Sequence, residues 1–163
     1  MDRSELLDEF RFLADKHGFS EVPPENVPES DATPPGPRVE FAHPKLRIVV
    51  SHNARDGFDC SLIYPGDSAG ISLGVLMSAL RPDGSRGQSS FVSPGDQSDF
   101  LRTRLARLLD IPPQTLDDCR ALRFYHAGPW RTQWGHTIQM DPESIRAERA
   151  RLDRLRGYFR TIP

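Results

Sequence analysis

The sequence has little of several residue types, and each shortage excludes a class of protein. Cys60 and Cys119 are the only cysteines among 163 residues, so a scaffold held by several disulfides is excluded. No apolar run approaches the roughly 20 residues that cross a bilayer. No Cys-x-x-Cys, His-x-x-x-His, P-loop or Gly-x-Gly-x-x-Gly spacing occurs, so we expect no metal and no nucleotide cofactor. The charged opening, Met1 to Glu5, lacks the apolar core of a secretion signal, and we expect a cytoplasmic protein without a membrane partner.

The residues that are present predict one α+β domain over 1–163. Apolar residues make up 37% of the chain and charged residues 27%, which is typical of globular proteins. The 15 prolines exceed the roughly eight expected at this length. Six of them fall between Phe19 and Pro37 among acidic residues, so this segment is predicted to be an extended, exposed connector.

Hydrophobic spacing predicts a helix, an antiparallel meander of three or four strands, and a helical second half. The segment 71–80 fits a short helix better than a fourth strand, and 82–95 is predicted to be a mobile loop because glycine, proline and serine dominate it. The two tryptophans fall in 130–140, which fits a loop or short strand. The expected helices are 4–17, 96–110, 115–126 and 141–160, and the expected strands are 39–42, 46–51 and 58–64.

Helix-start signals support three of these boundaries. Asp141 followed by Pro142 is a strong start for the last helix, because aspartate caps well and proline suits the first helical position. Asp96 with Asp99 is expected to open the helix at 96. Thr115-x-x-Asp118 matches a capping box and is expected to open the helix at 115.

Charge is distributed unevenly along the chain. Residues 1–31 carry nine acids against three bases, a net of −6, whereas residues 96–163 carry a net of +3. The net charge of −2 argues against general nucleic-acid affinity. An acidic surface can instead attract a basic protein such as a nuclease active site. The residues expected to form that surface are Asp8, Asp15, Glu21, Glu25 and Glu29.

A second candidate anchor lies between Tyr125 and His136. This segment concentrates tryptophan, tyrosine and arginine, the residue types that dominate protein–protein hot spots. The candidate contacts are Trp130, Arg131 and Trp134, although burial in the core is the favoured alternative for at least one of the two tryptophans.

Two other functions stay open. Gly70-Ile71-Ser72-Leu73-Gly74 matches the Gly-x-Ser-x-Gly pattern of hydrolases, but turn residues separate Ser72 from the preceding strand, so a chance match is favoured. A small enzyme would use residues between sheet and helices, with His52, Asp56, Ser72 and His126 as candidates. An arginine-mediated nucleic-acid or regulatory module is the third option, because the last helix is rich in arginine.

The order of these elements resembles a known class of protein. The helix Leu6–His17 followed by Gly18-Phe19, then Val39-Glu40-Phe41, the strands 46–50 and 58–63 and a helical second half, is similar to immunity proteins beside actinobacterial polymorphic toxins. The resemblance implies a non-catalytic protein that binds and neutralises one cognate toxin. It implies no shared catalytic residues.

Overall fold

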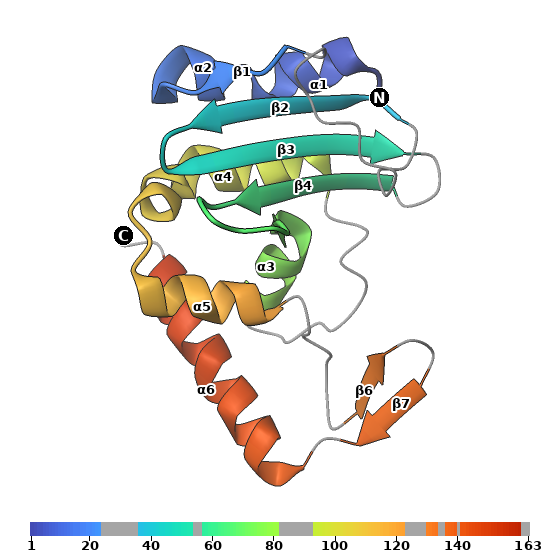
Figure 1. The fold of residues 1–163 in the computed structure, drawn as a ribbon, viewed down its shortest axis with the longest axis vertical. Coiled ribbons are helices and arrows are strands. Elements are labelled where there is room, and N and C mark those ends of the chain that lie inside the picture. Colours follow the sequence, from blue (N-terminus) through green and yellow to red (C-terminus); the bar gives the residue numbers. More distant parts are fainter. Residues whose placement is uncertain are drawn as a thin grey trace.

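The computed structural model describes residues 1–23, 36–53, 57–81, 93–122, 130–133, 136–139 and 141–160. It confirms the predicted α+β fold, with an N-terminal helical segment, an antiparallel sheet and a helical second half (Figure 1). The strands of the main sheet are β1 (Ser20–Glu21), β2 (Arg38–His43), β3 (Leu46–Asn53), β4 (Gly57–Ile63) and β5 (Ile71–Ser72). Each strand pairs antiparallel with the next one along the chain, so the sheet order is β1-β2-β3-β4-β5.

Alternation of side chains separates the two faces of this sheet. Val39, Val50 and Cys60 stand opposite one another on β2, β3 and β4, and all three are at most 1% exposed. They belong to the same buried cluster as Leu6 and Phe10 of the first helix, so this face meets the helices. The other face carries polar residues in its central strands.

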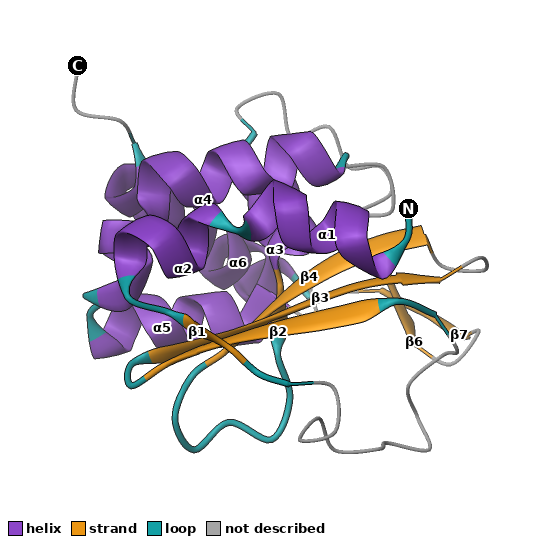
Figure 2. Ribbon diagram, turned by 90° about the horizontal axis from the view of Figure 1, so that it is seen from above, coloured by secondary structure: helices purple, strands orange, loops and turns teal. Residues whose placement is uncertain are grey.

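The helices form a layer on one side of the sheet and a second group beyond its β4–β5 edge. Helices α1, α2 and α4 lie over one face (Figure 2), and α6 packs against both α3 and α5 (Figure 1). Their bounds are α1 (Arg3–Phe10), α2 (Phe12–His17), α3 (Leu73–Leu80), α4 (Pro94–Leu109), α5 (Pro113–Ala121) and α6 (Pro142–Phe159).

The N-terminal segment is two helices rather than the single helix expected over 4–17. Asp2 caps α1 through the Glu5 N–H, and the Glu5 carboxylate accepts a hydrogen bond from the Asp2 N–H. The break falls at Arg11, between α1 and α2. Gly18 ends α2 at φ +72°, a left-handed conformation that glycine adopts without the steric penalty of a Cβ.

Several predicted boundaries need correction. Ser20 and Glu21 pair with Ala42 and Phe41, so the start of the predicted connector 19–37 belongs to the sheet. Segment 71–80 contains both a strand and a helix, the two alternatives considered for it, because β5 leads directly into α3. Helix α4 starts at Pro94, capped by Ser93 rather than Asp96, and therefore takes the last residues of the predicted loop 82–95. Residues 24–35 and 82–92 lie outside the described ranges.

The described residues of the predicted loop or short strand 130–140 form two short strands. Strand β6 (Trp130–Gln133) pairs antiparallel with β7 (His136–Gln139) in a sheet of its own. The hairpin stands in the chain between α5 and α6. The expected cap of α6 is confirmed, because the Asp141 carboxylate accepts a hydrogen bond from the Ser144 N–H and Pro142 takes the first helical position.

Arginine side chains join the C-terminal helices to the rest of the domain. Arg156 of α6 donates to the carbonyls of Ala79 and Arg81 at the end of α3. Arg104 of α4 in turn donates to the Phe159 carbonyl at the end of α6. The carbonyls of a last helical turn lack hydrogen-bond partners within their own helix and carry partial negative charge. Guanidinium groups there supply both hydrogen-bond donors and positive charge.

Candidate partner-binding surface

An acidic layer covers the outside of the N-terminal helices. We define it as the exposed carboxylates of α1 with its N-cap residue, of α2 and β1, and of the first turns of α4. Helix α4 contributes because it packs against α1, where the Ser98 hydroxyl donates to the Glu9 side chain and Arg102 donates to the Glu9 carbonyl. The members of the acidic layer are Asp2, Glu5, Asp8, Asp15, Glu21, Asp96 and Asp99.

Basic residues only partly neutralise the acidic layer. Four basic side chains lie among these acids, Arg3, Arg11, Lys16 and Arg102, together with the N-terminal amine beside Glu5. Arg104 and Arg107, further along α4, instead donate to carbonyls at the end of α6. Seven exposed acids therefore stand against five positive groups. Asp99 is 81% exposed, and its pairing with Arg102 is long, at 3.9 Å. The layer therefore keeps a net negative charge.

Two predicted members of this surface already have ion-pair partners. Asp8 accepts from Arg11 at 2.9 Å, with both side chains about two-thirds exposed, and Glu21 accepts from Arg3 at 2.6 Å. Exposed pairs of this kind contribute roughly 0–1 kcal/mol, because water screens them and two long side chains lose freedom. A basic partner can consequently replace either arginine at little energetic cost.

The other predicted contacts are distributed differently. Asp15 is exposed on α2. Glu25, Glu29 and Trp134 lie outside the described residues, whereas Trp130 and Arg131 lie in β6. Sequence reasoning missed Asp96 and Asp99, because only the packing of α4 on α1 brings them to this surface.

Ser72 has a structural role at the start of α3. Its hydroxyl accepts from the Val75 N–H at 3.5 Å and donates to Asp59 at 3.0 Å, so it caps the helix and joins β5 to β4. Asp59 also accepts from the Ser61 hydroxyl at 2.7 Å. A carboxylate thus stands where a hydrolase would need an imidazole to take the serine proton.

The residues proposed for an enzyme do not meet in the described structure. His52 pairs with Phe58 on the face that the helices cover, whereas Ser72 pairs with Ser61 on the opposite face. Asp56 and His126 lie outside the described residues. The sheet therefore separates the two candidates whose positions are described.

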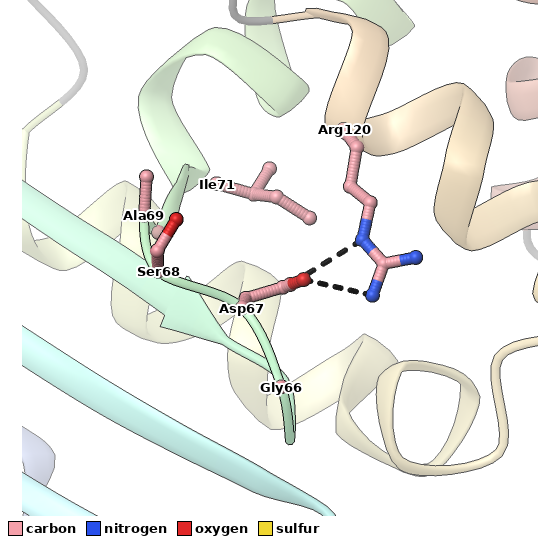
Figure 3. Close-up of a pocket in the computed structure, with 7 residues that line it drawn as sticks. Gly66, Asp67, Ser68, Ala69, Ile71 and Arg120 are labelled. Carbon is pink, nitrogen blue, oxygen red and sulfur yellow. Dashed lines mark hydrogen bonds and ion pairs between the residues drawn. The ribbon is translucent and has the colours of Figure 1, made fainter.

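A small polar pocket lies between the β4–β5 loop and α5 (Figure 3). Arg120 reaches into it and binds the Asp67 carboxylate with an Nη2–Oδ1 distance of 2.8 Å, while its Nη1 lies 2.9 Å from Asp117. The remaining lining residues belong to the loop Gly66–Ile71. All three guanidinium nitrogens of Arg120 lie within ion-pair or hydrogen-bond distance of a carboxylate of Asp67 or Asp117. These contacts join the loop to α5 and offset the positive charge that would attract an anion to the pocket.

The polar face of the sheet carries a second ion cluster. Glu40, 2% exposed, accepts from Arg38 at 3.3 Å and from Arg47 at 3.1 Å. A buried carboxylate is stable only with such partners, because its desolvation is costly. Arg38 and Arg47 therefore supply the charge compensation that Glu40 needs in the folded state.

The described ranges contain neither a metal-binding cluster nor a membrane-spanning helix. In those ranges no three His, Cys, Asp or Glu side chains lie close enough to hold a metal ion. No helix there is long and apolar enough to cross a membrane. No protein-family model, curated protein or solved structure matches the chain.

Proposed function

We propose that this protein is a non-catalytic inhibitor that binds a basic protein partner through the acidic layer. The observation that carries the proposal is the convergence of α1 and α4, which adds Asp96 and Asp99 to the acids of the N-terminal helices. Opposite surface charge accelerates encounter and disfavours wrong partners more than it adds raw affinity. This suits an inhibitor that must find one target quickly.

The resemblance to immunity proteins supplies the partner class. Under this proposal the partner is a cognate bacterial toxin whose basic active site the acidic layer covers, in the cytoplasm of the producing cell. Trp130 and Arg131 of β6 supply a second contact, since tryptophan and arginine are frequent hot-spot residues.

The test is capture of partners from the native host with the tagged protein at low and moderate salt. We expect one stoichiometric protein partner whose recovery falls as salt rises, because salt screens exposed charges. The double charge reversal Asp15→Lys and Asp99→Lys is expected to weaken binding at least tenfold, equal to about 1.4 kcal/mol.

Asp153→Lys is the control for each single reversal, Asp15→Lys and Asp99→Lys, because all three change the net charge by the same amount. Asp153 is 78% exposed on α6, outside the acidic layer, so its reversal changes charge without touching the proposed surface. Three outcomes would each contradict the proposal. The control could weaken partner binding as much as the reversals do, the double reversal could leave partner binding unchanged, or the tagged protein could retain nucleic acid or a small molecule in place of a protein.

A further inference from the structure

Among the described residues, no strand pairs with the outer edges of the hairpin β6–β7. Within the described residues it forms a two-stranded sheet with no third strand. A lone two-stranded hairpin is at best marginally stable in water, and native proteins usually protect strand edges with charge or proline. The residues of β7, His136-Thr137-Ile138-Gln139, include no proline and no Asp, Glu, Lys or Arg. Within the described part of the chain, this edge therefore lacks both a pairing strand and the residues that usually prevent pairing.

The register determines which backbone groups face outward. Gln133 stands opposite His136, with two residues between them in the chain, so this pair closes the hairpin and exchanges hydrogen bonds. Bonded and non-bonded pairs alternate along an antiparallel ladder. Thr132 and Thr137 form the next pair, so their N–H and C=O groups point away from each other. On β7, the outward groups belong to Thr137 and Gln139.

We propose that β7 pairs antiparallel with β7 of a second copy of this chain, giving a four-stranded sheet across a two-fold axis. In the symmetric register centred on Ile138, Thr137 stands opposite Gln139 of the second copy, and Gln139 stands opposite its Thr137. These pairs use every outward N–H and C=O group of Thr137 and Gln139 in both copies. Ile138 stands opposite Ile138 of the second copy at the closely spaced position, where two apolar β-branched residues are favourable.

The same geometry disfavours the other edge. On β6 the outward groups belong to Trp130 and Thr132, so a symmetric pairing would centre on Arg131. Two copies would then place Arg131 directly opposite Arg131, and like charges directly opposite each other are destabilising. The uncharged centre of β7 thus selects this edge for self-pairing. The inference is independent of the inhibitor proposal.

The test is the mass of the purified protein in solution, measured by light scattering over a concentration series. We expect the mass to rise toward twice the 18.4 kDa of the chain as concentration increases. The Thr137→Pro variant removes an outward N–H that the hairpin itself does not use, and it is expected to weaken self-association at least tenfold.

Thr132→Pro is the matched control, because Thr132 is the cross-strand partner of Thr137 and its N–H faces the opposite edge. The control is expected to associate like the unchanged protein. A mass of 18.4 kDa at all concentrations, equal effects of the two prolines, or loss of association with Thr132→Pro alone would each overturn the proposal. None of these outcomes depends on the toxin partner, so the two proposals fail separately.

Discussion

Arg154 holds the Asp118 carboxylate with two hydrogen bonds, from Nε at 2.8 Å and from Nη2 at 2.7 Å. Asp118 lies on α5 and is 4% exposed, and Arg151 of α6 lies 3.8 Å away on the same carboxylate. The fork of a guanidinium matches a carboxylate in both charge and direction. The pair therefore sets how α6 packs against α5.

Replacing Arg154 with alanine is expected to lower the free energy of unfolding, because the buried Asp118 carboxylate then keeps only Gln114 and the more distant Arg151 as partners. Urea denaturation measures the change. Arg149→Ala is the control, since Arg149 is exposed on the same helix and makes no ion pair with a described residue. If both variants lose the same stability, the helix rather than the pair is responsible.

Acid should weaken this pair in a defined direction. The hydrogen bonds from Arg154 hold the pKa of Asp118 below its ordinary value, which is about 3.9 in an unfolded chain. The folded state thus binds this proton more weakly than the unfolded state. The contribution is present above about pH 4 and is lost as pH falls through the lower folded pKa.

The measurement is the free energy of unfolding between neutral pH and acid. Asp118→Asn cannot titrate, so its stability should fall less steeply below about pH 4 than that of the unchanged protein. Identical slopes in the two proteins would show that other carboxylates account for the acid sensitivity.

Two glycines are expected to respond to alanine in opposite directions. A Cβ at Gly70 would lie 2.9 Å from the Ser61 Cβ, so Gly70→Ala should destabilise the protein by about 1–3 kcal/mol. Gly157 lies within α6 with open space around it, so Gly157→Ala should stabilise it by about 0.5–1 kcal/mol. Thermal unfolding distinguishes the two, and a Gly70→Ala protein as stable as the parent would contradict the close packing of the β4–β5 loop.

Both thiols should be unreactive in the folded protein. Burial raises the pKa of the Cys119 thiol to about 12, and it raises that of Cys60 as well. Since the thiolate is the reactive form, a pKa near 12 lowers its fraction on the order of a thousandfold relative to an ordinary cysteine. A thiol-specific dye at mildly alkaline pH should label the native chain slowly and label two sites in urea, and fast labelling of the native protein would show that a cysteine is accessible.

The sequence predicted the elements whose signals are local. Alternation of apolar residues located β2, β3 and β4, and Asp141 with Pro142 located the start of α6, because each signal depends on residues within one turn or strand. The capping box predicted at Thr115 and Asp118 was wrong, because a residue distant in the sequence binds the Asp118 side chain. Helix α5 begins at Pro113, and the Asp118 carboxylate accepts a hydrogen bond from Arg154, which lies 36 residues further along the chain.

Much of the candidate partner-binding surface could not be predicted from such local signals in the sequence. The acids of residues 1–31 were visible as a cluster in the chain, but Asp96 and Asp99 join them only after α4 packs on α1. The Arg3–Glu21 pair likewise depends on β1 adding to the sheet. Charge along a chain predicts the sign of a surface, whereas tertiary packing decides which charges belong to it.

The packing of α4 on the sheet also has a consequence for synthesis on the ribosome. Strands β2 to β4 pair in chain order, so the sheet can assemble as it emerges, with α1 and α2 already made. The end of α4 follows β4 by roughly 45 residues, which takes about 2 to 9 s at 5–20 residues per second. During that interval, the part of the apolar sheet face that α4 later covers is exposed to solvent. A nascent chain paused before α4 should therefore bind chaperones that a chain released after α6 escapes.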